Sequence, residues 1–373
     1  MPPLVLDIRS SEDPRDLIHR AVEALAHGKL VAFPTETVYG LAASALDEHA
    51  VERLLQVKNR NAGHALALAV KSADEALDYV PHMSALGQRL ARRCWPGPVT
   101  LVVPDQHPDS LLRQLPLAVQ QAVAPSGTIG FRVPAHPAII DVLNMLTGPV
   151  ALTSANRSGG PDPLTVQDVL SALGDDVDLV LDDGRCRFGQ SSSVVQVTDA
   201  GLQVLRQGVV SEQTLKRLSS FMVLFVCTGN TCRSPMAEAL CRKLIAERLG
   251  CAPDKLDEHG VLVASAGTSA HLGGRASPEG VQVLSEMGLD LTQHESQPLT
   301  PQLARQADLI LTMTRSHRQW ILGQWPEAAP RTKLLCHNQG DVADPIGGPP
   351  EFYKRCAEQI QAELAAHVAA MKL

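Results

Sequence analysis

The chain has 373 residues, of which 45% are hydrophobic and 20% charged, with eight cysteines and a formal net charge of -7. This length accommodates two domains with separate cores, and the acidic balance argues against a protein that grips nucleic acid mainly by neutralising phosphates. No apolar run reaches the ~18 residues of a membrane span, no basic N-terminal segment precedes a long apolar core, and the cysteines form no disulfide framework. We therefore expect a cytoplasmic protein with reduced thiols.

Helical and strand patterns alternate along the first half of the chain. Helical periodicity is expected over residues 13–28 and 50–57. Short apolar runs typical of strands cover residues 30–34, 64–70 and 149–152. This alternation predicts an α/β domain.

Polar clusters follow these strands, at the positions where α/β domains commonly bind ligands. The chain has neither Gly-x-x-x-x-Gly-Lys-Ser/Thr nor Gly-x-Gly-x-x-Gly, so any nucleotide must be held by side chains. Lys58 and Arg60 could neutralise a polyphosphate. Ser154, Asn156 and Ser192 could supply directional hydrogen bonds.

Each of these residues also has an ordinary structural explanation. The two cations fit a solvated strand edge, and the serines and asparagine are frequent turn formers. His64 fits a strand end, and Tyr39 fits a buried core. The residue types alone leave ligand binding and a structural role equally open.

Several short strings occur in a fixed order between Asp7 and Gly208. They are Pro34-Thr35-Glu36-Thr37-Val38-Tyr39-Gly40-Leu41, Lys58-x-Arg60, Arg132-x-Pro134, Ser154-Ala155-Asn156-x-Ser158-Gly159, Ser192-Ser193-Val194-Val195 and Arg206-x-Gly208. Together they closely resemble the threonylcarbamoyl-AMP synthase family, also called YrdC-like domains. Two departures, Ala65 in place of a frequent proline and Ser193 in place of a frequent threonine, remove no functional group.

The resemblance implies a twisted open α/β sheet that condenses L-threonine, bicarbonate and ATP to threonylcarbamoyl-AMP and pyrophosphate. It implies that the threonine and carbamate side is lined by Thr35, Tyr39, His64, Arg132, Ser154 and Ser192. It implies that ATP, with Mg²⁺ on its phosphates, is held by Lys58, Arg60, Thr128, Asn156 and Arg206. The product would pass to a separate tRNA threonylcarbamoyl transferase, with at most transient tRNA contact and no membrane involved.

The boundary between two domains is expected just after the last of these strings. Residues 209–220 show no strong core pattern and are interpreted as a linker. The domains are then residues 1–208 and 221–373.

The second domain opens with a strand, a tight loop and a helix start over residues 223–235. Gly229 and Asn230 tolerate positive φ, and Ser234 followed by Pro235 is expected to be an N-cap with proline at the first helical position. The N–H groups of the loop would then point inward with the helix dipole behind them. The pattern predicts an anion site.

A cysteine at the base of such a loop becomes a nucleophile. The loop N–H groups, Ser234 and Arg233 would stabilise the thiolate of Cys227. Arg233 also offers a planar fork to two phosphoryl oxygens. A buried structural cysteine beside a surface arginine is the alternative, but strand, glycine, arginine and helix start all coincide here. For Cys232 both a packing role and a reversible disulfide with Cys227 stay open.

The remaining patterns complete a small sheet. Strands are expected over residues 261–268, 307–313 and 333–335, with helices between them, which indicates a doubly wound parallel sheet. Near the end, Asp344 lies on a proline- and glycine-rich loop that could bring it over the anion site as a proton donor. Alone, Asp-Pro is most often just a turn.

The string from Cys227 to Ser234, together with Asp344-Pro345, resembles the low-molecular-weight protein-tyrosine-phosphatase family, and the likeness runs from Met222 to the C-terminus. The resemblance implies that Cys227 attacks phosphorus and that Asp344 protonates the leaving group and later activates water. Arg233 would stabilise the phosphoryl group, and Asn230 and Ser234 would shape the loop. No metal is required.

Two positions bear on the phosphatase substrate, which is expected to be a phosphorylated protein. Tyrosine phosphatases of this family usually have a bulky aliphatic residue where this chain has Thr231, and aromatic residues after the Asp-Pro, where it has Ile346 and glycines. Both features resemble the protein-arginine-phosphatase branch, so we expect phosphoarginine as substrate, with phosphotyrosine second. Arsenate reduction is disfavoured because no cysteine lies between Cys251 and Cys336 to relay electrons.

A third class of function is a regulatory protein that binds nucleotide or RNA and has an inactive phosphatase half. Loss of Cys227, Arg233 or Asp344 would favour it, and all three are present.

Overall fold

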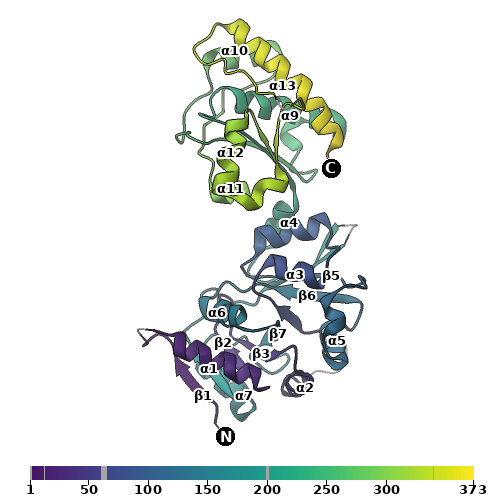
Figure 1. Ribbon diagram of the computed structural model, residues 1–373, viewed down its shortest axis with the longest axis vertical. Coiled ribbons are helices and arrows are strands. Elements are labelled where there is room, and N and C mark those ends of the chain that lie inside the picture. The colour runs from purple at the N-terminus through teal and green to yellow at the C-terminus, as the bar shows by residue number, and fades with distance from the viewer. Residues whose placement is uncertain (1, 12, 60–64, 199–200, 339) are drawn as a thin grey trace. The chain divides into compact units, whose positions relative to one another are not determined.

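The structure, a computed structural model, describes residues 2–11, 13–59, 65–198, 201–338 and 340–373. It divides into two compact units, Met1–Leu218 and Ser219–Leu373. Each unit is a sheet flanked by helices (Figure 1). Among the helices in these described ranges, none is long and apolar enough to cross a membrane.

The first unit is built on a ten-stranded mixed sheet in the order β1-β8-β2-β3-β7-β4-β6-β5-β9-β10. Its strands are β1 Leu4–Asp7, β2 Val31–Phe33, β3 Gly40–Ser44, β4 Ala67–Ala69, β5 Val99–Pro104, β6 Thr128–Arg132, β7 Val150–Ser154, β8 Leu179–Asp182, β9 Ser193–Thr198 and β10 Gly201–Arg206. Strand β7 is antiparallel to both β3 and β4, whereas β4 and β6 are parallel.

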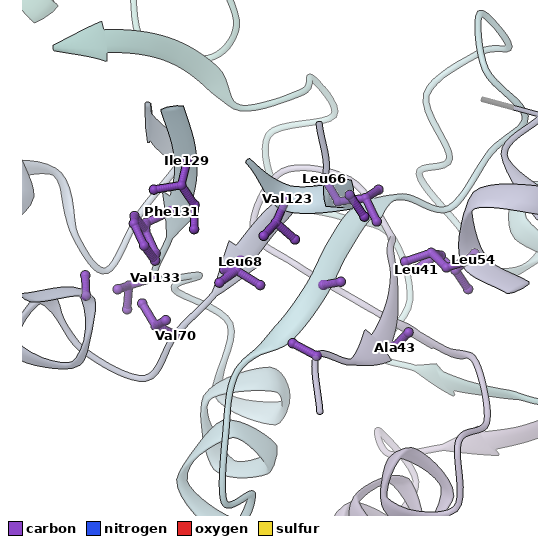
Figure 2. Close-up of a cluster of buried hydrophobic side chains, with 14 of the residues drawn as sticks. Leu41, Ala43, Leu54, Leu66, Leu68, Val70, Val123, Ile129, Phe131 and Val133 are labelled. Atoms are coloured by element: carbon purple, nitrogen blue, oxygen red, sulfur yellow. The ribbon is translucent and has the colours of Figure 1, made fainter. Parts of the chain in front are cut away.

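Helices cover both faces of this sheet. They are α1 Arg15–Ala26, α2 Glu48–Val57, α3 Ala73–Tyr79, α4 Ala85–Cys94, α5 Leu117–Val123, α6 Pro137–Met145, α7 Val166–Leu173 and α8 Glu212–Ser219, with short 3-10 turns η1 Leu111–Gln114 and η2 Gly174–Asp176. On one face Leu41 and Leu68 belong to a buried cluster that includes Leu54 of α2, which lies beside Leu41 in Figure 2. On the other face Ala42 and Ala69 pack against α1 and α6. Along β3, residues of the two clusters alternate because successive side chains of a strand point to opposite faces.

The second unit has a four-stranded parallel sheet in the order β12-β11-β13-β14. Its strands are β11 Phe221–Cys227, β12 Val261–Gly267, β13 Leu309–Thr312 and β14 Thr332–Leu334. Its helices are α9 Arg233–Leu249, α10 Pro278–Glu286, α11 Pro301–Gln306, α12 Arg315–Gln324 and α13 Pro350–Ala370, with the 3-10 turns η3 Pro253–Lys255 and η4 Pro326–Arg331.

The central strand β11 contributes to two separate cores. Val223 and Phe225 pack with α9, α10 and α13, which lie side by side in Figure 1. Leu224 and Val226 pack with α11 and α12 on the opposite face. All four side chains are fully buried, so β11 reads as a continuous apolar run rather than an alternating one. The α/β class predicted for both domains is confirmed.

The structure differs from the sequence interpretation in the segment between the domains. Residues expected to form a linker without a core pattern include helix α8, whose Leu215 is fully buried in the core of the first unit. The Arg93 guanidinium also donates a hydrogen bond to the carbonyl of Leu218 at 2.6 Å. A single buried leucine in two helical turns gives too weak a periodicity to be recognised from sequence.

Candidate functional sites

A cavity of about 360 Å³ lies over the central strands of the first unit. Five of the residues proposed from sequence line it: Thr128, Arg132, Ser154, Ser192 and Arg206. They come from β6, β7, the start of β9 and the end of β10, which the sheet order brings together. The described residues of this lining include two arginines, Arg132 and Arg206, and no carboxylate, a composition that favours anionic ligands.

Arg132 is held on one edge by the loop that follows β2. Its Nη2 donates to Glu36 Oε1 and to Thr37 Oγ1, at 2.8 Å each. The Nε of Arg132 is buried and has no hydrogen-bond partner within the described part of the chain. The Nη2 group of the guanidinium is therefore fixed, and Nε remains as a hydrogen-bond donor for a ligand.

Lys58 is 1% exposed and ties together the loop that follows β7. Its ammonium donates to the carbonyl oxygen of Ser154 at 2.7 Å, to Asn156 Oδ1 at 2.8 Å and to the carbonyl oxygen of Asn156. The hydroxyl of Ser154 donates to the same Oδ1 at 2.7 Å. The three residues predicted to contact ligands form one network, in which Lys58 fixes the backbone that presents Ser154 to the cavity.

Arg206 and Ser192 are paired on the opposite wall. Arg206 donates to the Ser192 carbonyl oxygen at 3.0 Å and to its hydroxyl at 3.2 Å, and that hydroxyl also contacts Thr100 Oγ1 at 3.2 Å. Burial lowers the pKa of Arg206. An anion that binds beside a partly desolvated cation of this kind stabilises its charged form.

Four described residues proposed from sequence, Lys58, Asn156, Tyr39 and Thr35, are not among those that line this cavity. Tyr39 is buried and its hydroxyl donates to the carbonyl of Gly184 at 2.8 Å, and burial raises its pKa. Thr35 is buried and donates to the Val38 carbonyl at 2.6 Å. Arg60 and His64 lie outside the described residues. Their ligand roles stay predictions.

In the second unit, strand β11 ends at Cys227 and helix α9 begins at Arg233, with a tight loop between them. Asn230 has the expected positive φ, 55°, whereas Gly229 does not belong to the positive-φ residues. The loop packs against Gly267, where an added Cβ would lie 2.4 Å from the Thr228 carbonyl oxygen, so only glycine fits there.

The prediction that Ser234 caps helix α9 is wrong. The N-cap is Cys232, which makes no side-chain cap hydrogen bond, and Ser234 lies inside the first turn. Its hydroxyl is instead 3.0 Å from Cys227 Sγ. The serine hydroxyl contacts the cysteine, as also expected from sequence, and does not cap the helix terminus.

Cys227 lies at the floor of the loop, 3% exposed. Its Sγ receives the backbone N–H of Asn230 at 3.2 Å. The Asn230 side chain braces the loop by donating to the hydroxyls of Ser234 and Ser265, at 2.9 Å each, and by accepting the N–H of Gln297. Ser265 was not recognised from sequence. A small polar residue inside an otherwise apolar strand was the available signal.

Arg233 and Asp344 meet at the edge of this loop. Arg233 Nη2 donates to Asp344 Oδ2 at 2.5 Å, and its Nη1 donates to the Val342 carbonyl at 3.3 Å. The arginine side chain is 6% exposed and the aspartate 41%. Among the described residues nothing accepts a hydrogen bond from the buried Nε of Arg233.

Thr231 lies on the loop wall, where its methyl group approaches Gly274. Cys232 Sγ contacts the hydroxyl of Tyr353 at 3.6 Å, and all eight cysteines are free thiols. Within the described ranges no cluster of three or more histidine, cysteine or acidic side chains could hold a metal ion.

A buried thiol in a backbone cradle, a fixed guanidinium and a half-exposed carboxylate are the parts of a cysteine-dependent phosphatase. The second unit therefore has the fold and site of that class, and the first unit is an α/β domain with an arginine-lined pocket.

Comparison with known proteins assigns families to both. Residues 23–208 match the Sua5/YciO/YrdC family, described as "Telomere recombination", and residues 222–373 match the family "Low molecular weight phosphotyrosine protein phosphatase". The chain belongs to both families, as a fusion of a threonylcarbamoyl-AMP synthase domain and a low-molecular-weight phosphatase domain.

Relatives of the first unit are synthases. The threonylcarbamoyl-AMP synthase of Pyrococcus abyssi is 34% identical over 203 residues, 54% of this chain and 56% of that protein. The chain thus matches little more than half the length of that relative. A Mycobacterium tuberculosis protein of the same family is 36% identical over 195 residues, 52% of this chain and 85% of that protein. The crystal structure of P. abyssi Sua5 complexed with L-threonine aligns with a TM-score of 0.52 and 25% identity, covering 70% of this chain and 92% of that one.

The second unit is similar to the protein-arginine-phosphatase of Bacillus subtilis, with 42% identity over 143 residues, 37% of this chain and 89% of that protein.

Proposed function

We propose that the first unit is an L-threonylcarbamoyladenylate synthase that condenses L-threonine, bicarbonate and ATP. The supporting observation is the cavity over β6, β7 and β9, lined by two arginines and no carboxylate. Because the lining lacks carboxylates, magnesium would enter as part of the ATP complex, held by the phosphates themselves. Transfer of the product to tRNA belongs to a separate transferase.

In this reaction an oxygen of the threonine carbamate attacks the α-phosphorus of ATP and pyrophosphate leaves. Two anions must approach each other, so cationic side chains lower the barrier by positioning and charge stabilisation. Arg132, fixed by Glu36 and with a free Nε, suits the threonine carboxylate or carbamate. Arg206 suits the phosphates, and Lys58 holds the Ser154–Asn156 backbone in place.

Pyrophosphate release from ATP that depends on L-threonine and bicarbonate tests this proposal. Lys58→Ala should abolish it, and Lys71→Ala, at an exposed lysine outside the cavity, is the matched control. Because Lys58 also braces a loop, Arg206→Ala serves as a second variant, and circular dichroism verifies folding. ATP turnover that ignores threonine in the unmodified chain would refute the synthase.

We propose that the second unit is a cysteine-dependent protein phosphatase that acts on phosphoarginine. The supporting observation is the contact of Cys227 Sγ with Ser234 Oγ and the Asn230 N–H, beside an Arg233 whose buried Nε has no hydrogen-bond partner among the described residues. Cys227 attacks phosphorus, the P–N bond breaks, and Asp344 gives a proton to the departing guanidine nitrogen. Water, losing a proton to Asp344, then displaces the thiolate from phosphocysteine.

Phosphate release from a phosphoarginine peptide and from a phosphotyrosine peptide of the same sequence measures the preference. Cys227→Ser should abolish both activities. Faster hydrolysis of phosphotyrosine would exclude the arginine assignment but keep the phosphatase. Alkylation of Cys227 by iodoacetate should outpace that of glutathione at neutral pH. Equal alkylation rates would exclude a thiolate nucleophile.

A further inference from the structure

A buried histidine lies behind the first residue of the phosphatase loop. His317, 6% exposed on helix α12, places its Nε2 2.9 Å from the hydroxyl oxygen of Thr228, the residue that follows the nucleophile. This is the only contact that the described part of the chain provides to that hydroxyl. The Thr228 backbone is fixed separately, since its carbonyl accepts the N–H of Ser269 at 3.0 Å.

The contacts of the other ring nitrogen favour one arrangement of the hydrogens. His317 Nδ1 is 2.9 Å from the hydroxyl oxygen of Thr314, which caps helix α12 by accepting the backbone N–H of His317. Thr314 also contacts the Ser316 hydroxyl at 2.8 Å, to which it can give its own proton. An oxygen that already acts as the cap acceptor favours Nδ1–H as a second donor to it. Nε2 is then the acceptor, and the Thr228 hydroxyl donates to it.

Burial keeps this ring neutral. Burial and the charge of Arg233 lower the pKa of His317 to about 4, with Asp344 and Asp341 opposing the shift. A neutral imidazole has one donor and one acceptor, as the hydrogen-bond chain requires.

With its proton given to His317, Thr228 keeps its oxygen lone pairs for a ligand. Thr228 is exposed beside Cys227, so this acceptor lies at the open rim of the loop. The guanidinium part of a phosphoarginine carries several N–H donors and no acceptor, whereas an aryl phosphate ester has no N–H at its leaving group. We infer that the hydroxyl oxygen of Thr228, oriented by His317, accepts a hydrogen bond from an N–H of a guanidinium leaving group. This hydrogen bond contributes to a preference for substrates with a P–N bond over phosphate esters. This inference rests on the proposed phosphatase function.

The experiment compares kcat/KM for a phosphoarginine peptide and for p-nitrophenyl phosphate in the full chain. Thr228→Val keeps the shape of the side chain and removes the acceptor, and it should lower the phosphoarginine-to-aryl ratio about 10- to 100-fold, as expected for a hydrogen bond to a charged group. His317→Leu should do the same. His317→Gln, which retains an acceptor, should keep most of the ratio.

His367→Gln is the matched control, because His367 is another partly buried histidine, bonded to the Leu335 carbonyl and not to the loop. It should leave the ratio unchanged. If Thr228→Val lowers kcat/KM equally for both substrates, Thr228 and His317 only brace the loop. That result would overturn this inference but not the proposed phosphatase function. If the unmodified chain hydrolyses only the aryl ester, both this inference and the assignment of phosphoarginine as substrate are wrong. If it hydrolyses neither substrate, the proposed phosphatase function is wrong as well.

Discussion

A buried ion pair anchors the polar loop of the first unit, so removing one partner has a predictable cost. Arg132 Nη2 and Glu36 Oε1 are 2.8 Å apart, and each side chain is only 8% exposed. The second oxygen of Glu36 accepts the N–H of Ala135 at 2.9 Å. Glu36→Gln keeps the shape of the side chain but leaves Arg132 as a buried cation without its counter-ion.

The geometry sets the size of the effect. At 2.8 Å the gross attraction of two unit charges is about 6 kcal/mol for an effective dielectric constant of about 20. Desolvation of both ions cancels much of this, but breaking a buried pair from one side costs about 3–5 kcal/mol because the other charge stays buried. Glutamine still offers a hydrogen-bond acceptor, so we expect Glu36→Gln to lower the free energy of unfolding of the first unit by about 3 kcal/mol.

Urea unfolding measures this loss if the first unit has its own reporter. The tryptophans are Trp95, which is 2% exposed in the first unit, and Trp320 and Trp325 in the second. Changing the latter two to phenylalanine leaves Trp95 as the fluorescent reporter. A double-mutant cycle in this background uses Glu36→Gln, Arg132→Met and the double variant. The double variant should be about 2–3 kcal/mol more stable than the sum of the two single changes in the free energy of unfolding predicts. Additivity to within about 0.5 kcal/mol would refute the pair as a coupled unit.

Three further predictions concern the second unit. Asp344→Asn should lower kcat on phosphoarginine peptides by about 10²- to 10⁴-fold. The decrease should be smaller for phosphate esters of acidic phenols, whose leaving groups need little protonation. An equal decrease in kcat on both substrates would contradict the role of Asp344 as an acid. Thr231→Ile should shift the ratio of phosphate release from phosphoarginine toward phosphotyrosine peptides, and an unchanged ratio would argue against Thr231 as a specificity residue. Because the pKa of His317 is about 4 in the fold and near 6.5 when unfolded, the unfolded chain binds more protons between these values. Stability should fall as pH drops through this window, by up to about 3 kcal/mol, and urea unfolding of His317→Gln should lack that part of the pH dependence.

The loops of both sites could be predicted because each is encoded within a few residues. An apolar strand, a residue that tolerates positive φ and an arginine six places after the cysteine all lie inside one short segment, and β11, Asn230 and α9 follow that pattern. In the first unit, polar residues after an apolar run marked the end of β7, which borders the cavity, whereas Arg132 at the end of β6 was proposed only through the family resemblance. Local patterns, together with the ordered strings of the first unit, therefore predicted which segments form the two candidate sites.

The partners that orient these side chains could not be predicted, because the fold brings them together from distant segments. Glu36 and Arg132 are 96 positions apart, and Thr228 and His317 are 89 apart. No periodicity or spacing relates such pairs, and only sheet order and helix packing set their distances. A buried acid inside a polar turn was the one local hint that Glu36 requires a cationic partner.

The two sites use arginine in the same way but with different freedom in the carboxylate beside it. Arg132 and Arg233 each have Nη2 bound to a carboxylate and a buried Nε without a partner in the described residues. Fixing Nη2 orders the rest of the guanidinium in advance, which lowers the entropic cost of binding an anion. Glu36 is 8% exposed and cannot leave its arginine without exposing a buried charge, so Arg132 suits a fixed anchor. Asp344 is 41% exposed on a loop with Gly347 at φ 73°, so it can exchange Arg233 for a leaving group, as the proposed proton donor must.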